Sequence, residues 1–220
     1  ESFRLSSFPV PTDIDAATPV GPLPGYPLTD AWTEDVPVDG VVLTDEEVLG
    51  FCALLLVAGY ETTTNLLGNS AVVLAQHRQI RRCLGADRTL LGPAVEELLR
   101  YDSPAQGLSR TLTRDVTLHG TTMRQGEKVL LLFGSANRDE RAFPEPDVFD
   151  IERRSEHQVA FGRGIHFCLG ASLARMETRI ALNALLDKVP DWEVDLDSAR
   201  RLRSGPIRGY TSLPITWTTA

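Results

Sequence analysis

An apolar stretch without turn signals runs from Thr44 to about Gln76, and its pattern predicts one long helix. TDEE at 44–47 satisfies the Ser/Thr-x-x-Glu capping box, which marks a helix start. The middle of the stretch, FCALLLVAG at 51–59, is apolar on every side, as is typical of an enclosed helix. We therefore expect other elements of the fold to bury this helix along its middle.

The rest of the chain alternates between helical and strand-like patterns. A shorter helix should end near Gly85, and Pro93 should open the helix PAVEELLRY, which stops before Pro104. Alternating positions at 108–118 and 127–133, with turns at HGTT and RQGE, predict a small antiparallel sheet. An amphipathic helix is expected at 170–188 and a terminal hairpin at 205–218. The predicted fold class is mainly α with a small antiparallel β subdomain.

Residues 1–40 have a different composition from the rest. They hold seven of the fourteen prolines, and their seven acidic residues against one basic residue account for most of the net charge of −8. Prolines at this density fit neither a helix interior nor a central strand. We predict an extended or disordered segment over 1–40 and one domain over 41–220. The acidic balance disfavours a nucleic-acid partner.

Composition also bears on the compartment. The apolar run at 51–59 is about half of the roughly 20 residues that a membrane span needs, so no span and no membrane partner are predicted. The first residues, ESFRLSSFPV, lack the features of a secretion signal, which indicates a cytoplasmic protein. Cys52, Cys83 and Cys168 are too few and too widely spaced for a disulfide framework.

The segment FGRGIHFCLG at 161–170 is the strongest candidate for chemistry. Gly162 and Gly164 allow positive φ and the close approach of a flat partner. Cys168 stands at the start of the predicted helix, where free N–H groups and the helix dipole favour the thiolate over the thiol. A thiolate in such a place is a metal ligand or a nucleophile.

Three other interpretations of this segment stand beside that one. Cys168 can be a buried structural cysteine in a glycine-rich turn. A zinc site built on His166-x-Cys168 lacks ligands, because no second cluster of Cys or His completes a tetrahedron. A nucleophilic Cys/His enzyme lacks any surrounding signature.

Two further motifs lie on predicted helices. AGYETT at 58–63 places a glycine within the long helix, which predicts a local opening beside Gly59, with Glu61 and Thr62 offering a carboxylate and a hydroxyl for proton delivery. The ordinary alternative is a glycine at a helix crossing. In EELLR, Glu97 and Arg100 stand three residues apart and can form an ion pair.

Taken together, and in the order AGYETT, EELLR and FGRGIHFCLG along the chain, the three motifs resemble those of the cytochrome P-450 family of heme-thiolate monooxygenases, especially its soluble bacterial members. AGYETT is similar to the oxygen-activation segment of the family's central helix, and Glu97-x-x-Arg100 is similar to its Glu-x-x-Arg pair. The family pattern Phe-Gly-x-Gly-x-His-x-Cys-x-Gly is matched at Phe161, Gly162, Gly164, His166, Cys168 and Gly170.

The resemblance implies a cofactor and a role for each position. Cys168 would be the axial ligand of the iron in heme b, in a loop kept open by Gly162, Gly164 and Gly170. Phe161 would pack beside the sulfur, and His166 and Arg110 would bind the heme propionates.

On the long helix, Gly59 would leave room for O2, and Glu61 and Thr62 would route protons to it. Glu97 and Arg100 would be structural.

The resemblance also has departures. Many relatives have an arginine where this chain has Val148, and we expect Arg153 or Arg154 to replace it. The similarity covers residues 44–217, which correspond to the C-terminal half of a family member. The N-terminal half, which would supply the opposite heme wall, is not recognisable in residues 1–40. A fragment, one half of a split protein and a natural truncation are all compatible with this pattern.

The implied reaction is the insertion of one oxygen atom from O2 into a small organic substrate, with two electrons from a redox partner. An acidic ferredoxin-like donor would dock on residues 151–180, where five arginines oppose three glutamates; an ordinary charged helix surface is the alternative. A shortened, non-catalytic helper is the competing function. Positions expected to face the substrate are Pro104, Ala105, Gln106, Tyr210 and Thr211.

Overall fold

The computed structural model describes residues 2–4, 42–153 and 157–217. Contacts within the chain divide it into two units, one of Glu1–Ser6 with Gly59–Ala220 and one of Ser7–Ala58. The predicted extended segment at 1–40 lies outside the described residues except for β1 (Ser2–Arg4), so that prediction and the boundary at residue 41 stay predictions. None of the described helices is long and apolar enough to cross a membrane.

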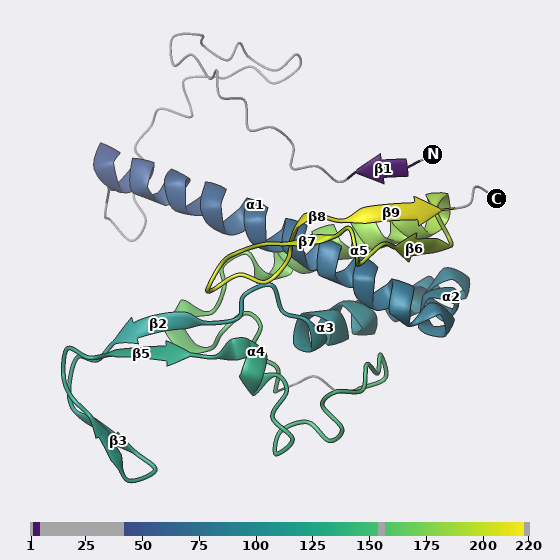
Figure 1. The fold of residues 1–220 in the computed structure, drawn as a ribbon. Helices are drawn as coiled ribbons and strands as arrows, with labels where there is room; N and C mark the ends of the chain where they lie inside the picture. The colour runs from purple at the N-terminus through teal and green to yellow at the C-terminus, as the bar shows by residue number, and fades with distance from the viewer. Residues whose placement is uncertain (1, 5–41, 154–156, 218–220) are drawn as a thin grey trace. The chain divides into compact units, whose positions relative to one another are not determined.

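Helix α1 (Asp45–Gln76) confirms the predicted long helix and its capping box (Figure 1). The Thr44 N–H donates to Glu47 Oε2 at 2.8 Å, and the Glu47 N–H donates to Thr44 Oγ1 at 3.3 Å. The predicted local opening beside Gly59 is wrong, because α1 continues through AGYETT without a break. The side chains of Thr64 and Asn65 bond to carbonyls one turn earlier, at 2.9 and 2.8 Å.

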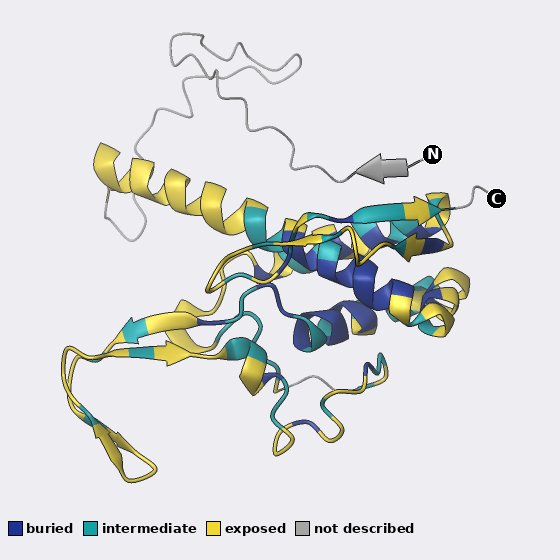
Figure 2. Ribbon diagram, in the orientation of Figure 1, coloured by how far each residue is buried: buried dark blue, intermediate teal, exposed yellow. Residues whose placement is uncertain are grey.

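The burial of α1 differs between its halves, which corrects the expectation that its middle is enclosed. The second half is buried from Asn65 to Ala75, with few exceptions. The first half is exposed throughout (Figure 2), and Leu56 and Val57 are 75% and 68% accessible. The reason is that no element among the described residues covers these apolar side chains.

The core of the larger unit is helical. Leu74 of α1, Leu84 of α2, Leu98 of α3 and Leu182 of α5 belong to one buried cluster, together with the indole of Trp192. Helix α3 begins two residues before Pro93, because the first-turn N–H groups have no intrahelical acceptors and a proline there removes no bond. The elements are α2 (Arg78–Ala86), η2 (Arg88–Leu90), α3 (Leu91–Tyr101) and α5 (Ala171–Lys188).

The predicted small antiparallel sheet is present as two separate pairs of strands. Strand β2 (Leu108–Thr111) pairs with β5 (Lys128–Leu131), and β3 (Val116–Leu118) pairs with β4 (Thr121–Met123). The short helix α4 (Phe133–Ala136) follows β5.

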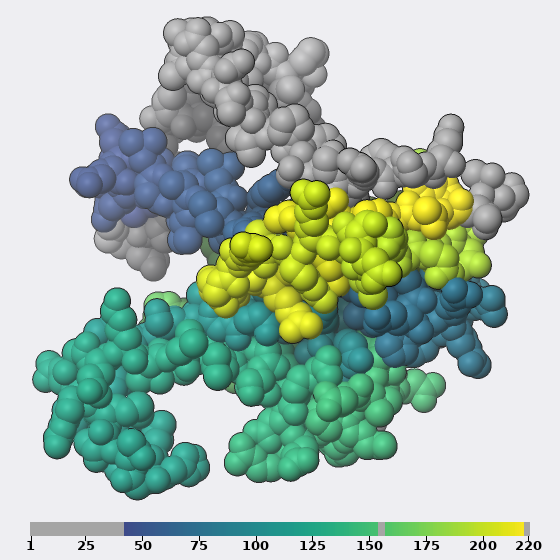
Figure 3. Space-filling view, viewed as in Figure 1, coloured from purple at the N-terminus to yellow at the C-terminus, as the bar shows by residue number. Residues whose placement is uncertain are grey.

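The predicted terminal hairpin at 205–218 is wrong. Strand β8 (Tyr210–Ser212) pairs with β7 (Arg200–Arg201), and β9 (Pro214–Trp217) pairs with β6 (Trp192–Val194). Only Leu213 separates β8 from β9, which is too little for a reversing turn, since the tightest hairpins have two-residue loops. Leu213 is instead buried against Ala71 and Val72 of α1. Figure 3 shows the yellow C-terminal residues next to blue and teal residues from earlier in the chain.

Candidate functional site

The loop before α5 carries the exposed thiol of Cys168 on a backbone that is held by hydrogen bonds. Gly162 and Gly164 adopt φ values of +71° and +76°, the left-handed region that glycine favours. The Cys168 N–H donates to Phe161 O at 3.0 Å, and the Phe167 N–H donates to Gly164 O at 3.0 Å. The second of these bonds closes the short helix η3 (Gly164–His166). The chain therefore returns on itself so that Phe161 and Cys168 lie side by side.

Cys168 is not a buried structural cysteine, because the loop from Arg163 to Gly170 is exposed. Helix α5 begins at Ala171, so Cys168 stands just before the helix rather than within its first turn. Its flanking side chains, Phe167 and Leu169, are apolar and exposed.

These features fit a flat, largely apolar cofactor that takes one axial ligand from the protein. A Cβ added at Gly164 would meet nothing within 4 Å, and one at Gly170 would come within 4.0 Å of Cys168 Sγ. Gly170 thus leaves the space beside the sulfur open, while Phe167 and Leu169 offer apolar contact to a planar group.

Glu97 and Arg100 of α3 form the predicted ion pair, and both side chains are fully buried. Arg100 Nε and Nη2 donate to the two Glu97 oxygens at 2.7 Å each. Arg100 Nη1 also donates to the carbonyls of Asn137 and Pro146 at 2.9 Å. The pair therefore ties α3 to the irregular segment around residue 146.

Arg153, one of the two arginines expected to take the place of the one absent at Val148, contacts Glu97. Its Nε lies 3.4 Å from Glu97 Oε1, and its other nitrogens donate to the carbonyls of Pro144 and Glu145. Val148 contributes its carbonyl, which accepts from Arg100 at 3.3 Å. Arg154 lies outside the described residues.

Sequence reasoning missed Asn137, which links the buried pair to the cysteine loop. Its Oδ1 accepts from the Val159 N–H at 2.7 Å, and its Nδ2 donates to Ser103 Oγ at 3.0 Å. Asn137 follows the four-residue helix α4, and no spacing in the sequence signals a partner at residue 159.

A second ion pair close to the loop was also missed. Glu96 accepts from Arg175 of α5 and from Gln158, while the Arg175 guanidinium lies 4.5 Å from the Phe161 ring centre. The hydrogen bond from Arg175 to Glu96 raises the pKa of Arg175 above its ordinary value, and burial opposes this effect. The doublet Glu96-Glu97 is visible in the sequence, but it does not indicate which acid pairs with which base.

The remaining predicted residues lie on other elements. Glu61 and Thr62 are half-buried on α1, where its buried half begins. Arg110 is half-buried on β2, opposite Val129, and its Nη1 donates to the neighbouring Ser109 carbonyl at 3.0 Å. His166 is exposed on η3. The roles of these four residues stay predictions.

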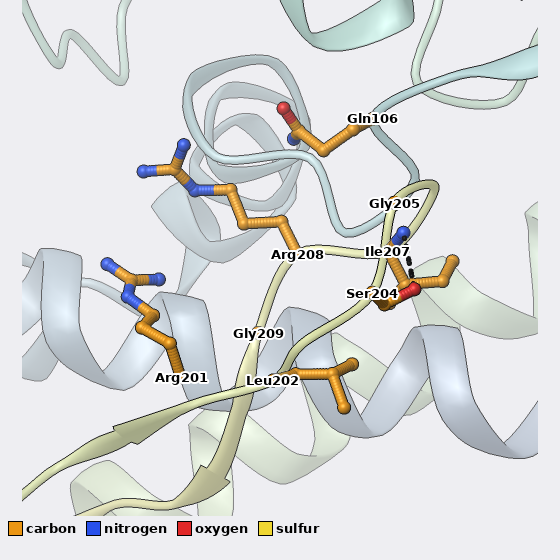
Figure 4. A pocket seen from close by; sticks show the side chains of 8 residues that line it. All are labelled: Gln106, Arg201, Leu202, Ser204, Gly205, Ile207, Arg208 and Gly209. Carbon is orange, nitrogen blue, oxygen red and sulfur yellow. Dashed lines mark hydrogen bonds between the residues drawn. The ribbon is translucent and has the colours of Figure 1, made fainter.

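One of the two segments expected to face a substrate, 104–106, lies against residues 206–208. The Gln106 N–H donates to Pro206 O, and the Arg208 N–H donates to Pro104 O, both at 2.7 Å. A pocket of about 350 Å³ opens here (Figure 4), with the Arg201 and Arg208 side chains along it. Its lining comprises Gln106, Arg201, Leu202, Ser204, Gly205, Ile207, Arg208 and Gly209.

Two groups near this pocket have perturbed acidity. Burial raises the pKa of Asp102 above its ordinary value, and the nearby cation of Arg208, with Nε 2.8 Å from Asp102 Oδ1, opposes the shift. Burial likewise raises the pKa of Tyr210. Of the predicted substrate-facing positions, Gln106 lines the pocket, and the loop at 201–209 was missed.

Comparison with known proteins identifies the family of this chain. The family model described as cytochrome P-450 matches residues 26–200, most of the chain. The chain belongs to the cytochrome P-450 family. Its members use heme b as their cofactor, and several of the matched relatives are named as hydroxylases or monooxygenases.

Several relatives are closely similar over the same region. Putative cytochrome P-450 123 of Mycobacterium tuberculosis is 47% identical over 180 residues, which are 81% of this chain and 45% of that protein. Vitamin D(3) 25-hydroxylase of Pseudonocardia autotrophica is 45% identical over 181 residues, again 81% of this chain and 45% of that protein.

Solved structures confirm the fold of this part of the family. A cytochrome P-450 of Bacillus megaterium in complex with testosterone superposes with a TM-score of 0.79 at 42% identity. The superposition covers 84% of this chain and 51% of that one. The chain thus spans about half the length of the relatives that it matches.

Proposed function

We propose that this chain carries the thiolate side of a heme-thiolate monooxygenase, which inserts one oxygen atom from O2 into a small organic substrate with two electrons from a redox partner. The observation that supports it most is the exposed Cys168 thiol in its glycine-lined, backbone-bonded loop. The relatives named as hydroxylases and monooxygenases support the reaction class. A cytoplasmic location stays a prediction of the sequence.

Heme b, when bound, supplies the iron at which O2 is activated, and a thiolate ligand favours cleavage of the O–O bond. In this assignment Cys168 Sγ is that ligand. The hydrogen bond from the Cys168 N–H to Phe161 O fixes the backbone that carries the sulfur. The half-buried Phe161 would pack beside the sulfur in this assignment. Gly162, Gly164 and Gly170 leave room for the macrocycle.

Two basic residues are assigned to the cofactor's carboxylates. His166 is exposed two residues before the thiol, and Arg110 extends from the separate strand β2. Cationic side chains from two different elements would fix the rotation of the cofactor in its plane, because each propionate would bind its own donor.

Proton delivery is assigned to α1. Glu61 can take a proton from solvent on its carboxylate, and the Thr62 hydroxyl can donate one toward O2. Both residues are half-buried, which suits groups that connect solvent to an enclosed site. A Thr62→Ala variant is expected to lose most of the coupling between electron consumption and product.

The electron donor is assigned as an acidic, ferredoxin-like protein that docks near the cysteine loop. Arg163 and Arg179 are two of the five arginines that oppose three glutamates in residues 151–180, and the net positive charge of this segment supports the docking of an acidic partner. Reversal of both charges, Arg163→Glu with Arg179→Glu, should slow donor-dependent reduction, and this slowing should shrink as salt is raised. An unchanged rate would contradict this assignment.

A second function has one observation in its favour. The first half of α1 exposes apolar side chains on all sides, and the chain spans about half the length of its relatives. A helper, or one half of a two-part enzyme, would use this surface to bind the polypeptide that completes the fold.

The ferrous-CO difference spectrum of the 220-residue chain supplied with heme tests the first function. We expect the strongly red-shifted Soret band of thiolate ligation, lost in Cys168→Ala and kept in Cys83→Ala, whose thiol is also exposed. A thiolate band that survives in Cys168→Ala would refute the assignment of the ligand. The absence of heme uptake by the wild-type chain would refute heme binding by this chain alone and favour the second function.

A further inference from the structure

Adjacent carboxylates on α3 bind two different arginines. Glu97 is buried and pairs with Arg100, whereas Glu96 accepts from Arg175 Nε at 2.5 Å and from Arg175 Nη2 at 3.0 Å. Successive residues of a helix stand about 100° apart around its axis, so neighbours can reach different parts of a fold. Glu97 holds Arg100, which donates to the Pro146 carbonyl, and Glu96 contacts Arg175 of α5.

Two residues from the loop side converge on Glu96. Besides the Arg175 fork, Gln158 Nε2 donates to Glu96 Oε2 at 2.7 Å, and Gln158 Oε1 accepts from the Ala160 N–H at 3.2 Å. Arg175 also places its guanidinium 4.5 Å from the centre of the Phe161 ring. The Glu96 carboxylate is therefore linked, directly or through Gln158 and Arg175, to three residues that lead into the cysteine loop, namely Gln158, Ala160 and Phe161.

The connection continues to the thiol. Phe161 O accepts from the Cys168 N–H at 3.0 Å, so a shift of Phe161 would displace the backbone that carries the sulfur. The same groups frame a hollow of about 530 Å³, whose lining comprises Glu96, Gln158, Phe161, Gly162, Arg163, Gly164, Phe167 and Arg175.

We propose that Glu96, Arg175 and Gln158 form a clamp that holds the Cys168 loop in its ligand-presenting geometry before any cofactor binds. Glu96 and Arg175 are thus positioning residues, which act on Cys168 through Phe161. The meaning of that geometry rests on the proposed function, whereas the ordering of the loop does not.

An ordinary surface ion pair is the alternative, since the Glu96 and Arg175 side chains are each one-third exposed. Isolated exposed pairs contribute little, because solvent screens them and ordering two long side chains is unfavourable. This pair differs in its forked geometry, its second donor and its ring contact. Helix α5 also has its own buried anchors, Leu182 and Leu186, so loss of Arg175 should leave the helix docked.

Hydrogen exchange followed by mass spectrometry on the 220-residue chain without heme tests the clamp. In Arg175→Gln we expect peptides covering 159–168 to exchange about fivefold faster, as for the loss of a weak local restraint. Peptides covering 182–192 should keep the wild-type rate. Glu96→Gln should have the same effect, and the double variant should add little to either single one.

The matched control is Asp187→Asn, which removes the contact of Asp187 with Arg88 Nη2 (2.5 Å) at the far end of the same helix. It should leave the exchange of 159–168 unchanged. The clamp is refuted if Arg175→Gln matches this control in the loop. It is also refuted if the 182–192 peptides exchange faster to the same degree, since the pair would then be holding α5 and not the loop.

Heme uptake by the wild-type chain is measured in parallel, so the two hypotheses fail separately. A wild-type chain that takes up no heme while Arg175→Gln loosens the loop would contradict heme binding by this chain alone and support the clamp. Normal heme uptake with an unchanged loop in Arg175→Gln would do the reverse.

Discussion

Replacing Glu97 by glutamine should destabilise this chain more than any single surface change. Glu97 accepts four hydrogen bonds, two from Arg100 at 2.7 Å, one from the Asp150 N–H at 3.0 Å and one from Arg153 at 3.4 Å. Its side chain and that of Arg100 are both fully buried. Glutamine has nearly the same volume, so the substitution removes the charge and leaves the packing.

The magnitude follows from the charge that remains. Removing one partner of a buried ion pair costs about 3 to 5 kcal/mol, because the other charge stays buried without compensation. Arg100 keeps its bonds to the Asn137 and Pro146 carbonyls, which places the expected loss near the lower end, at about 3 kcal/mol. A typical domain has only about 5 to 15 kcal/mol of unfolding free energy in total.

Urea denaturation followed by far-UV circular dichroism measures this loss as a shift of the midpoint. The matched control is Asp115→Asn, which removes an ion pair with Arg124 whose side chains are 49% and 71% exposed. That variant should unfold at the wild-type midpoint. A Glu97→Gln midpoint equal to that of Asp115→Asn would refute the view that this buried pair anchors the fold.

Three further predictions use the same titration. Gly209→Ala should cost about 1 to 3 kcal/mol by overpacking, because an added Cβ would lie 2.8 Å from Asn65 Cβ, whereas Gly205→Ala in the same loop meets nothing and should be neutral. Arg153→Leu should cost about 1 kcal/mol, less than Glu97→Gln, because Glu97 keeps its bonds to Arg100; an equal loss would contradict this order. Hydrogen bonds from Arg141 lower the pKa of Asp139 to about 2 from 3.8, so the stability that Asp139→Asn removes should be fully present above pH 3.8 and vanish as pH falls through 2; a difference that persists below pH 2 would contradict this.

Features set by residues close in sequence could be predicted. The capping box at Thr44 and Glu47 and the pair Glu97–Arg100 each join positions three apart, and helix geometry alone brings such positions together. The positive φ of Gly162 and Gly164 is also local, because the residue type itself indicates the conformation.

Features that depend on distant partners could not be predicted. The bond from Val159 to Asn137 crosses 22 positions and the Arg175–Glu96 pair crosses 79, and a single sequence carries no sign of either. The terminal hairpin failed for a related reason. Two strand-like runs predict that strands exist, but β8 and β9 found partners in β7 and β6 because one residue between them cannot reverse the chain.

The first half of α1 is a different case. Its apolar pattern correctly predicts a helix, but the predicted burial of that helix is wrong. A helix that is apolar all round is stable in water only when enclosed, and the buried second half of α1 shows how neighbouring elements achieve this. A second copy of this chain meeting it at one face would leave the opposite face in water. Full enclosure needs elements on several sides, and the relatives are about twice as long as the part that this chain matches. The exposed apolar half of α1 therefore supports the second proposed function, in which another polypeptide encloses this surface.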